Sequence, residues 1–209
     1  MFKGLRIPLK VLKIRIRIRI SLNIRLNIRL IGVVVRLADF LRIASPLVQR
    51  GWAVFPVIPD GKIPLTPNGF KDASIDGDVL AGWARKYPGA NVGIATGARS
   101  GLAVIDVDVK GGKSGKRSIA RVPGFVKATY TVRTPSGGLH YYYKTLEEVR
   151  SCNGFMDGVD LKVDGGYVVG PGSSINGEPY RCIRDIPLAR FPLPQLYRKK
   201  AKKAEGTTP

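Results

Sequence analysis

The clearest pattern in the chain is an apolar run over residues 102–109, Leu-Ala-Val-Ile-Asp-Val-Asp-Val. β-Branched residues dominate it, which is typical of a buried strand. Its only polar members are Asp106 and Asp108, and side chains two residues apart on a strand point to the same face. The pattern therefore predicts a strand that carries two carboxylates side by side at its end.

Similar patterns predict the other elements of the central region. Helical spacing covers residues 37–50, although Pro46 is expected to break a single helix there, with Ser45-Pro46 able to cap a second one. Asp76 is expected to cap a helix over 78–86 that turns Val79, Leu80 and Trp83 inward. Strands are predicted at 52–58, 92–95, 102–109, 130–133, 139–144, 159–163, 167–169 and 180–183. Helices early and strands later indicate an α+β fold with a mixed or antiparallel sheet, and a Gly/Lys-rich stretch at 110–117 reads as an exposed, flexible loop.

The two ends of the chain differ from this middle. Residues 11–31 alternate apolar and polar residues with period two, and LNIR occurs twice in tandem. Residues 1–36 are read as a basic, low-complexity N-terminal arm, either one that follows a phosphate backbone or an extension outside the fold. Residues 191–209 turn Pro-rich and then basic, as in a tail or linker, which leaves 37–190 as the expected folded domain.

Charge narrows the class of partner. The net charge is +20 and the pI about 10.4, with ten Lys and Arg and no acid in residues 1–36. Such a surplus favours a polyanion, with nucleic acid as the first expectation and an acidic membrane surface as the second. No apolar stretch approaches the ~20 residues that cross a bilayer, so no membrane span is expected. Cys152 and Cys182 with a single histidine make neither a disulfide framework nor a structural zinc site, which favours a reducing, cytoplasmic setting.

The paired acids have two interpretations. Asp106 and Asp108 would repel each other and raise each other's pKa unless a cation lay between them. Carboxylate oxygens suit Mg²⁺ or Mn²⁺, which share the rest of their shell with water and substrate phosphate. Alternatively, both acids are solvated at the end of a strand.

The only histidine follows a turn. In Thr134-Pro-Ser-Gly-Gly-Leu-His140, the segment Ser136, Gly137 and Gly138 is expected to bring a hydroxyl and free backbone amides close to the imidazole of His140, a combination that suits a triphosphate. The alternative is a histidine satisfied within the sheet. The strand at 139–144 would present His140 and Tyr142 on one face, Tyr141 and Tyr143 on the other.

A third acid lies in the next strand. Asp160 and Lys162 share a face of the strand at 159–163, and an unpaired carboxylate among apolar neighbours is costly. Asp160 is therefore either a third metal ligand or the partner of Lys162 or an arginine in a salt bridge. Asp164 with Gly165 and Gly166 is expected only to make a hairpin turn.

Five blocks in this order resemble the bifunctional primase/polymerase domain of the archaeo-eukaryotic primase superfamily, found in plasmid, phage and prophage replication proteins. The blocks are GWAVFPVIPDGKIPL (51–65), GF-KDAS (69–74), NVGIATGARSGLAVIDVD (91–108), TPSGGLHYYYK (134–144) and GVDLKVDGGYVVGPGS (158–173). The resemblance covers roughly residues 37–190. It implies a primase catalytic core, in which a small RRM-like sheet joins an N-terminal αβ unit.

The resemblance also implies roles. Asp106, Asp108 and Asp160 match the acids that bind two divalent ions, Mg²⁺ or Mn²⁺. His140, after the Ser136–Gly138 turn, matches the contact to the incoming nucleotide's phosphates. Lys162 stands where many relatives have a basic residue, so a phosphate contact is implied there, and Lys62 and the 96–101 segment match blocks without a firm role.

The residue patterns and the family resemblance together lead us to expect template-directed nucleotidyl transfer, that is, DNA primase or DNA polymerase activity. The expected partners are a DNA template and primer, and the expected substrate is a dNTP or an NTP. The zinc-binding insertion of some relatives is missing between Lys144 and Gly158, and no GxxxxGK[ST] motif of a helicase motor is present, so any replicative helicase would be a separate partner. The alternative from another class is a non-catalytic nucleic-acid-binding remnant of a replication protein.

Overall fold

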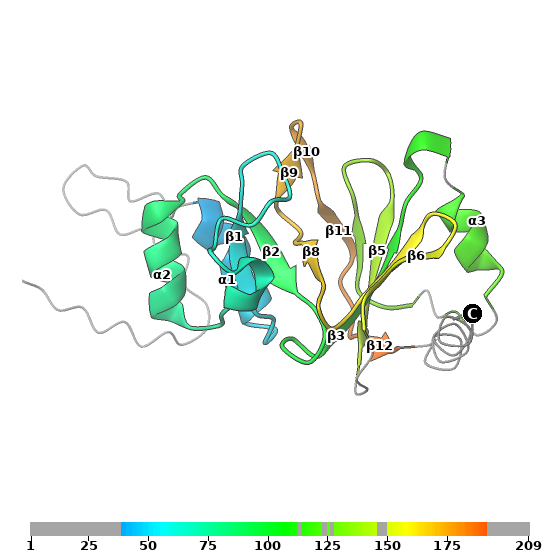
Figure 1. Ribbon diagram of the computed structural model, residues 1–209, viewed down its shortest axis with the longest axis horizontal. Coiled ribbons are helices and arrows are strands. Elements are labelled where there is room, and N and C mark those ends of the chain that lie inside the picture. Colours follow the sequence, from blue (N-terminus) through cyan, green and yellow to red (C-terminus); the bar gives the residue numbers. More distant parts are fainter. Residues whose placement is uncertain (1–38, 113, 123–124, 126–127, 146–149, 192–209) are drawn as a thin grey trace, which may run out of the picture. The chain divides into compact units, whose positions relative to one another are not determined.

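The computed structural model describes residues 39–191 except 113, 123–124, 126–127 and 146–149 (Figure 1). The predictions for the 1–36 arm and for most of the 191–209 tail lie outside the described residues. Three α-helices are α1 (Asp39–Val48), α2 (Gly77–Lys86) and α3 (Gly115–Ala120), and two short 3₁₀ turns are η1 (Gly69–Asp72) and η2 (Lys110–Gly112). The strands are β1 (Val54–Val57), β2 (Asn91–Ala95), β3 (Leu102–Val107), β4 (Thr131–Arg133), β5 (Leu139–Lys144), β6 (Cys152–Met156), β7 (Val159–Lys162), β8 (Tyr167–Val169), β9 (Ser174–Ile175), β10 (Glu178–Pro179), β11 (Arg181–Arg184) and β12 (Ala189–Arg190).

Two sheets organise these strands, besides the β9–β10 ribbon. The larger has seven strands in the order β11-β4-β5-β3-β7-β6, with β12 added parallel to β5, and its other pairings are antiparallel. The smaller has the order β1-β2-β8, also antiparallel. The expectation of an α+β chain with a mixed or antiparallel sheet is confirmed.

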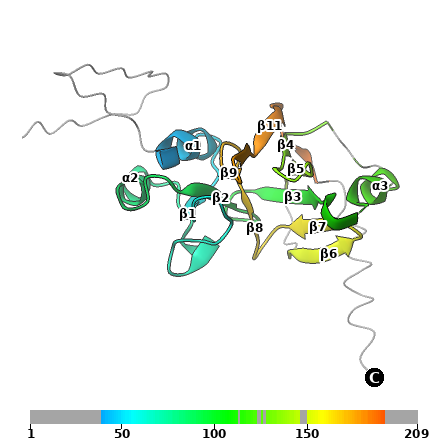
Figure 2. The same ribbon diagram turned by 90° about the horizontal axis from the view of Figure 1, so that it is seen from above.

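The core lies on both faces of the larger sheet. Alternation along β5 sends Tyr142 to one face, where it packs with Val104 and Val132, and sends Tyr141 and Tyr143 to the other, as the period-two pattern predicted. The first cluster is covered by α1 and α2, and the second by Ile119 of α3. Figure 2 shows α1 and α2 beside β1 and β2, and α3 beside β3.

The two longer helices depart from expectation in detail. α1 runs through Pro46 to Val48 instead of breaking, because a proline this close to the last turn costs only one backbone hydrogen bond. Asp76 caps α2 as predicted, accepting hydrogen bonds from the backbone of Asp78 at 2.8 Å and Val79 at 3.1 Å. Val79 itself is 40% exposed, so only Leu80 and Trp83 of the predicted three turn toward the core.

Three further predictions need correction. The stretch at 110–117 is not a loop throughout, since α3 begins at Gly115, where the glycine fits against Gly158 and Asp108. The turn at Asp164–Gly166 is not a hairpin: β7 pairs with β3 and β6, whereas β8 pairs with β2 in the smaller sheet. The strands β6, β9, β10 and β12 were not predicted from the sequence.

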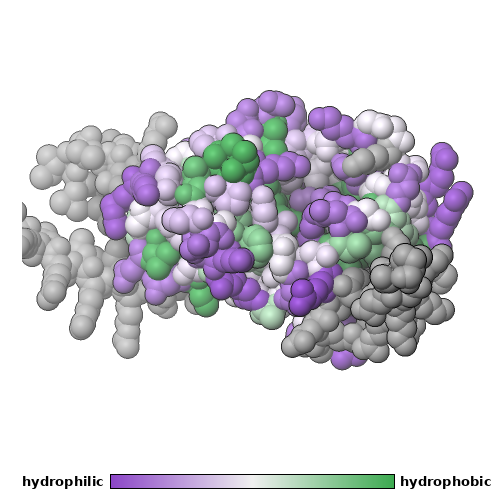
Figure 3. Space-filling view, in the orientation of Figure 1, coloured by the Kyte–Doolittle hydropathy of each residue, from purple (hydrophilic) through white to green (hydrophobic). Residues whose placement is uncertain are grey.

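No helix among the described residues is long and apolar enough to cross a membrane. On the face shown in Figure 3, hydrophobic areas are small and separated by hydrophilic ones. Scattered exposed apolar side chains of this kind are ordinary on a protein surface.

Candidate active site

Three neighbouring strands of the larger sheet bring predicted site residues together. Asp106 on β3 lies opposite His140 on β5 and, on its other side, opposite Asp160 on β7. His140 Nε2 is 3.4 Å from Asp106 Oδ1. The antiparallel register thus makes a row of one imidazole and two carboxylates from residues 20 to 54 positions apart in sequence.

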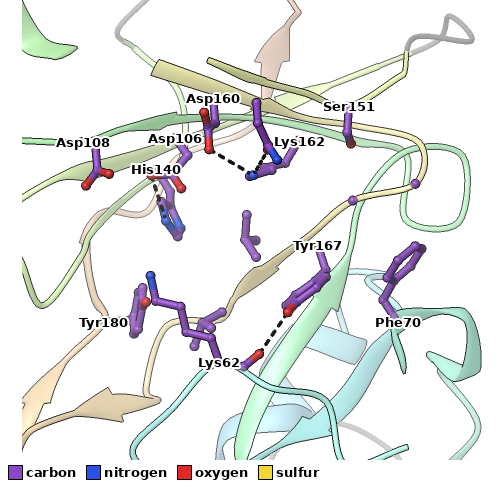
Figure 4. A pocket seen from close by; sticks show the side chains of 15 residues that line it. Lys62, Phe70, Asp106, Asp108, His140, Ser151, Asp160, Lys162, Tyr167 and Tyr180 are labelled. Atoms are coloured by element: carbon purple, nitrogen blue, oxygen red, sulfur yellow. Dashed lines mark hydrogen bonds and ion pairs between the residues drawn. The ribbon is translucent and has the colours of Figure 1, made fainter. Parts of the chain in front are cut away.

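These side chains open into one pocket with a volume of about 540 Å³ (Figure 4). Asp108, just beyond the end of β3, also lines it, and its backbone N–H donates to Gly158 O at 2.7 Å. The ionisable acidic and basic side chains around this part of the lining are those of Lys62, Asp106, Asp108, His140, Asp160 and Lys162. A second hollow, lined by Asp108, Asn153, Asp157 and Asp160 among others, lies against the same acids.

Asp106 is held in its charged form. Burial acts to raise its pKa, but the neighbouring imidazole of His140, through charge and hydrogen bonding, and the positive charges of Lys162 and Lys62 outweigh burial, so the pKa lies below its ordinary value of 3.8. An ionised, largely buried carboxylate among cationic groups is a natural ligand for a divalent ion or a partner for a ligand's proton donors.

Asp160 already has partners from the protein. Lys162 Nζ donates to Asp160 Oδ2 at 3.1 Å and to Asn153 Oδ1 at 2.6 Å, and the backbone N–H of Gly154 donates to Asp160 Oδ1 at 2.7 Å. The salt bridge with Lys162, one of the two alternatives for Asp160, is therefore present. It does not exclude the other, because each carboxylate oxygen carries two lone pairs and can accept a second partner.

His140 is 4% exposed and lies between aromatic rings. Its ring centre is 5.7 Å from that of Tyr180 and 6.2 Å from that of Tyr142. Among the described residues its Nδ1 has no hydrogen-bond partner, although it is buried. Buried polar atoms are nearly always partnered, so this nitrogen is a position where a ligand or water would bind.

The Ser136–Gly138 turn lies next to the acids. Ser136, Lys62, Asp108 and Tyr180 line a hollow that continues from the main pocket. The expectation of free amides is wrong for Gly137, whose N–H donates to Thr134 O at 3.0 Å. A Cβ at position 138 would lie 2.5 Å from Val107 O. Gly138 therefore allows the turn to approach the end of β3 more closely than any residue with a side chain could.

The acids offer the right chemistry for a hard divalent ion. Asp106, Asp108 and Asp160 provide only oxygen ligands, which Mg²⁺ and Mn²⁺ prefer. In the part of the chain that the structure describes, however, no three acidic, His or Cys side chains converge closely enough to form a ready-made ion site. The donor types fit such an ion, and the ionised Asp106 and the second lone pairs of Asp160 leave acceptor capacity for it.

Some pocket residues were missed from the sequence. Phe70, Tyr167 and Tyr180 line the pocket, but the sequence predicted no role for them. Lys62 also lines it and had been matched only to a family block without a firm role. Phe70 and Lys62 fall inside sequence blocks that resemble the primase family, which was the only available signal. The 96–101 segment proves structural: a Cβ on Gly97 would overlap Asp164, whose Oδ1 accepts the N–H of Ala98 at 2.7 Å.

The family follows from comparison with known sequences. Residues 44–194 match the model of the bifunctional DNA primase/polymerase, N-terminal family (Prim-Pol). The match spans most of the chain, so the chain belongs to this family, as its sequence blocks indicated. No curated protein matches it significantly. Membership indicates a function of the primase or polymerase type, with DNA and nucleotides as substrates, in a family that generally uses divalent metals.

Proposed function

We propose that this protein is a metal-dependent nucleotidyltransferase that extends a primer along a DNA template in replication, with residues 37–190 as a primase-type catalytic core. The observation that carries the proposal is the row of His140, Asp106 and Asp160 on three adjacent strands, opening into a pocket with Lys62 and Lys162. A triphosphate and its counter-ions need this combination of carboxylates and cationic groups.

Each residue has a proposed part in the reaction. Asp106, Asp108 and Asp160 would hold the divalent ions, which when bound lower the pKa of the primer 3′-hydroxyl and offset the charge on the leaving pyrophosphate. The 3′-hydroxyl gives its proton to water and its oxygen forms a bond to the α-phosphorus, while the bond from that phosphorus to the α,β-bridging oxygen breaks and pyrophosphate leaves. Lys62, Lys162 and His140 would bind the phosphate oxygens and orient the α-phosphate for in-line attack.

The proposal also includes the binding partners of the protein. The basic surplus would give the protein a salt-dependent, sequence-independent hold on the template, to which the 1–36 arm could add. dNTP and NTP remain equal candidates for the substrate, a helicase would be supplied by another protein, and the proposed setting is the cytoplasm of a cell that carries a phage, prophage or plasmid.

Primer extension tests this proposal. The protein is incubated with primed DNA template, Mg²⁺ or Mn²⁺, and either dNTPs or NTPs, alongside Asp106→Asn, Asp160→Asn and Asp78→Asn, the last an exposed control on α2. We expect extension by the wild type and by Asp78→Asn, and a loss of roughly 100-fold or more in the other two variants. Asp164→Ala is unsuitable as a control, because Asp164 holds the backbone of Ala98.

Two results would count against the proposal. DNA binding without extension under either metal would favour a non-catalytic remnant of a replication protein. Extension that survives Asp106→Asn and Asp160→Asn would place the chemistry elsewhere in the protein.

A further inference from the structure

Two aromatic rings form one wall of the pocket that contains the acids. Phe70 on η1 and Tyr167 at the start of β8 are stacked, with ring centres 5.9 Å apart and planes 26° from parallel. Both line the same pocket as Asp106 and Asp160, and in Figure 4 they lie on the other side of it from Asp108. Neither ring has a part in the proposed chemistry.

Packing and hydrogen bonds to neighbouring residues fix the position of the two rings. Tyr167 and the fully buried Phe55 pack edge to face, with ring centres 5.3 Å apart and planes at 79°. The Tyr167 hydroxyl donates to Lys62 O at 3.0 Å. Asp72 accepts hydrogen bonds from both nitrogens of Asn68 at 2.9 Å and closes the short turn that carries Phe70. The two rings are therefore held in place. Both are only half-buried, and both line the pocket.

A half-buried aromatic pair is unusual beside so many charges. The charged side chains of the lining would bind phosphates and hydrated divalent ions, to which an aromatic ring offers no oxygen ligand and no hydrogen-bond donor. The ligand group that aromatic faces bind well is a nucleobase, whose stacking on Phe, Tyr or Trp is tolerant of sequence. Phosphate-binding groups and a stacking surface thus occur at different places in one cavity.

We infer that Phe70 and Tyr167 form a stacking platform for a nucleobase, so that the pocket binds a nucleotide by its base as well as by its phosphates. The inference rests on the proposed function, because it assigns one further part of the same site. The base can come from the incoming nucleotide or from the templating strand, and the two sources share the same chemistry.

The variants separate stacking from packing. Phe70→Leu keeps an apolar side chain on η1 but removes the π face. Tyr167→Phe keeps the ring and removes only the hydrogen bond to Lys62. Phe125→Leu is the matched control: Phe125 is a phenylalanine of similar burial that packs against Tyr141 outside the pocket.

Binding is measured by calorimetry with Mn²⁺ and two probes, a dNTP whose α,β-bridging oxygen is replaced by NH and inorganic tripolyphosphate. Stacking of one base is worth roughly 5- to 150-fold in affinity. We expect the wild type to bind the dNTP analogue more tightly than tripolyphosphate by a factor in that range. Phe70→Leu should weaken binding of the analogue about 5-fold or more and leave tripolyphosphate binding unchanged. Tyr167→Phe, which retains the ring, should retain the ratio of the two affinities, and Phe125→Leu should change neither affinity.

Templates distinguish the two sources of the base. If Phe70→Leu weakens analogue binding only when primed template is present, and this effect disappears with an abasic site at the templating position, the platform serves the template base. An effect without DNA assigns it to the incoming nucleotide. Either result supports the platform.

Other results overturn the inference. Equal wild-type affinity for the analogue and tripolyphosphate, with no effect of Phe70→Leu on any template, would exclude a stacking platform and leave the phosphate site and the proposed function standing. A wild type that binds neither probe would contradict the nucleotide site itself, and with it the proposed function.

Discussion

Asp106 on β3 and Asp160 on β7 are directly opposed across two antiparallel strands. Like charges in facing positions of a sheet destabilise it. The protein offsets the repulsion with groups of its own: the ammonium of Lys162 pairs with Asp160 at 3.1 Å, and the imidazole of His140 lies 3.4 Å from Asp106. Any divalent ion that joins these acids therefore shares Asp160 with a lysine whose positive charge opposes it.

Replacing that lysine gives the first prediction. Lys162→Met should lower the free energy of unfolding without metal by about 1–2 kcal/mol, because Asp160 loses a partly buried ionic hydrogen bond. Addition of Mn²⁺ should then raise the melting temperature more in Lys162→Met than in the wild type, since no lysine competes for Asp160. Thermal unfolding with and without Mn²⁺ measures both effects. Lys86→Met on α2 is the control, and a Mn²⁺ shift equal to or smaller than that of the wild type would contradict the competition.

The turn that carries Phe70 gives a pH prediction. Hydrogen bonds from the Asn68 backbone and then its side chain lower the pKa of Asp72 from its ordinary value of 3.8. A carboxyl whose pKa is lowered by folding stabilises the fold above its unfolded pKa, and the contribution is lost as the pH falls through the folded value. We expect the Asn68 amide resonance to move only below about pH 4, and to lose this transition in Asp72→Asn. A titration at or above the ordinary aspartate pKa would show that these hydrogen bonds do not form.

Gly115 at the start of α3 gives a steric prediction. A Cβ there would lie 2.2 Å from Gly158 O and 2.5 Å from Asp108 O, both backbone atoms that cannot move independently. Gly115→Ala should cost about 1–3 kcal/mol of stability and should reduce primer extension under conditions where the variant is still folded, because it displaces Asp108. Gly77→Ala on α2 has open space at its Cβ and should be neutral or slightly stabilising. If the two variants show the same free energy of unfolding in denaturant, the predicted steric clash at position 115 does not occur.

Asp164 provides the complementary case of an acid with a structural role. Asp164→Ala should lower stability by about 1 kcal/mol, since the N–H of Ala98 loses its acceptor. The stabilisation by Mn²⁺ should remain that of the wild type, because Asp164 is not among the proposed ligands. Thermal melts with a Mn²⁺ titration test this. A lost metal response would make Asp164 a fourth acid of the site.

Local patterns predicted the strands that carry the site but not their partners. The apolar run ending in Asp106 and the alternation around His140 defined two strands and their faces, because side-chain period depends only on local backbone geometry. The pairing of β8 with β2 was missed, since an apolar period does not say which strand edge it joins. The contacts of Asp160 with β6 were missed because Asn153 and Gly154 are poor strand formers.

Residues that meet only through the tertiary fold were also beyond sequence reasoning. Phe70 and Tyr167 are separated by almost a hundred positions and stack because η1 and β8 both contact β2. Nothing in the local pattern around either residue distinguishes a pocket ring from a core ring. α3 was missed for a different reason: its glycine and lysine content is typical of loops, and close backbone packing on Gly158 overrides that preference.

The crossing from β7 to β8 has a mechanical consequence. Lys62 belongs to the part of the chain around the smaller sheet, whereas His140 belongs to the larger, and both contribute to one pocket. A ligand that touched both would link the sheets non-covalently, in addition to the chain connections at 96–101, 163–166 and 170–180. Occupancy would then slow amide exchange in β1 and β2, far from the reacting phosphate, so that the smaller sheet would report on the loading of the larger one.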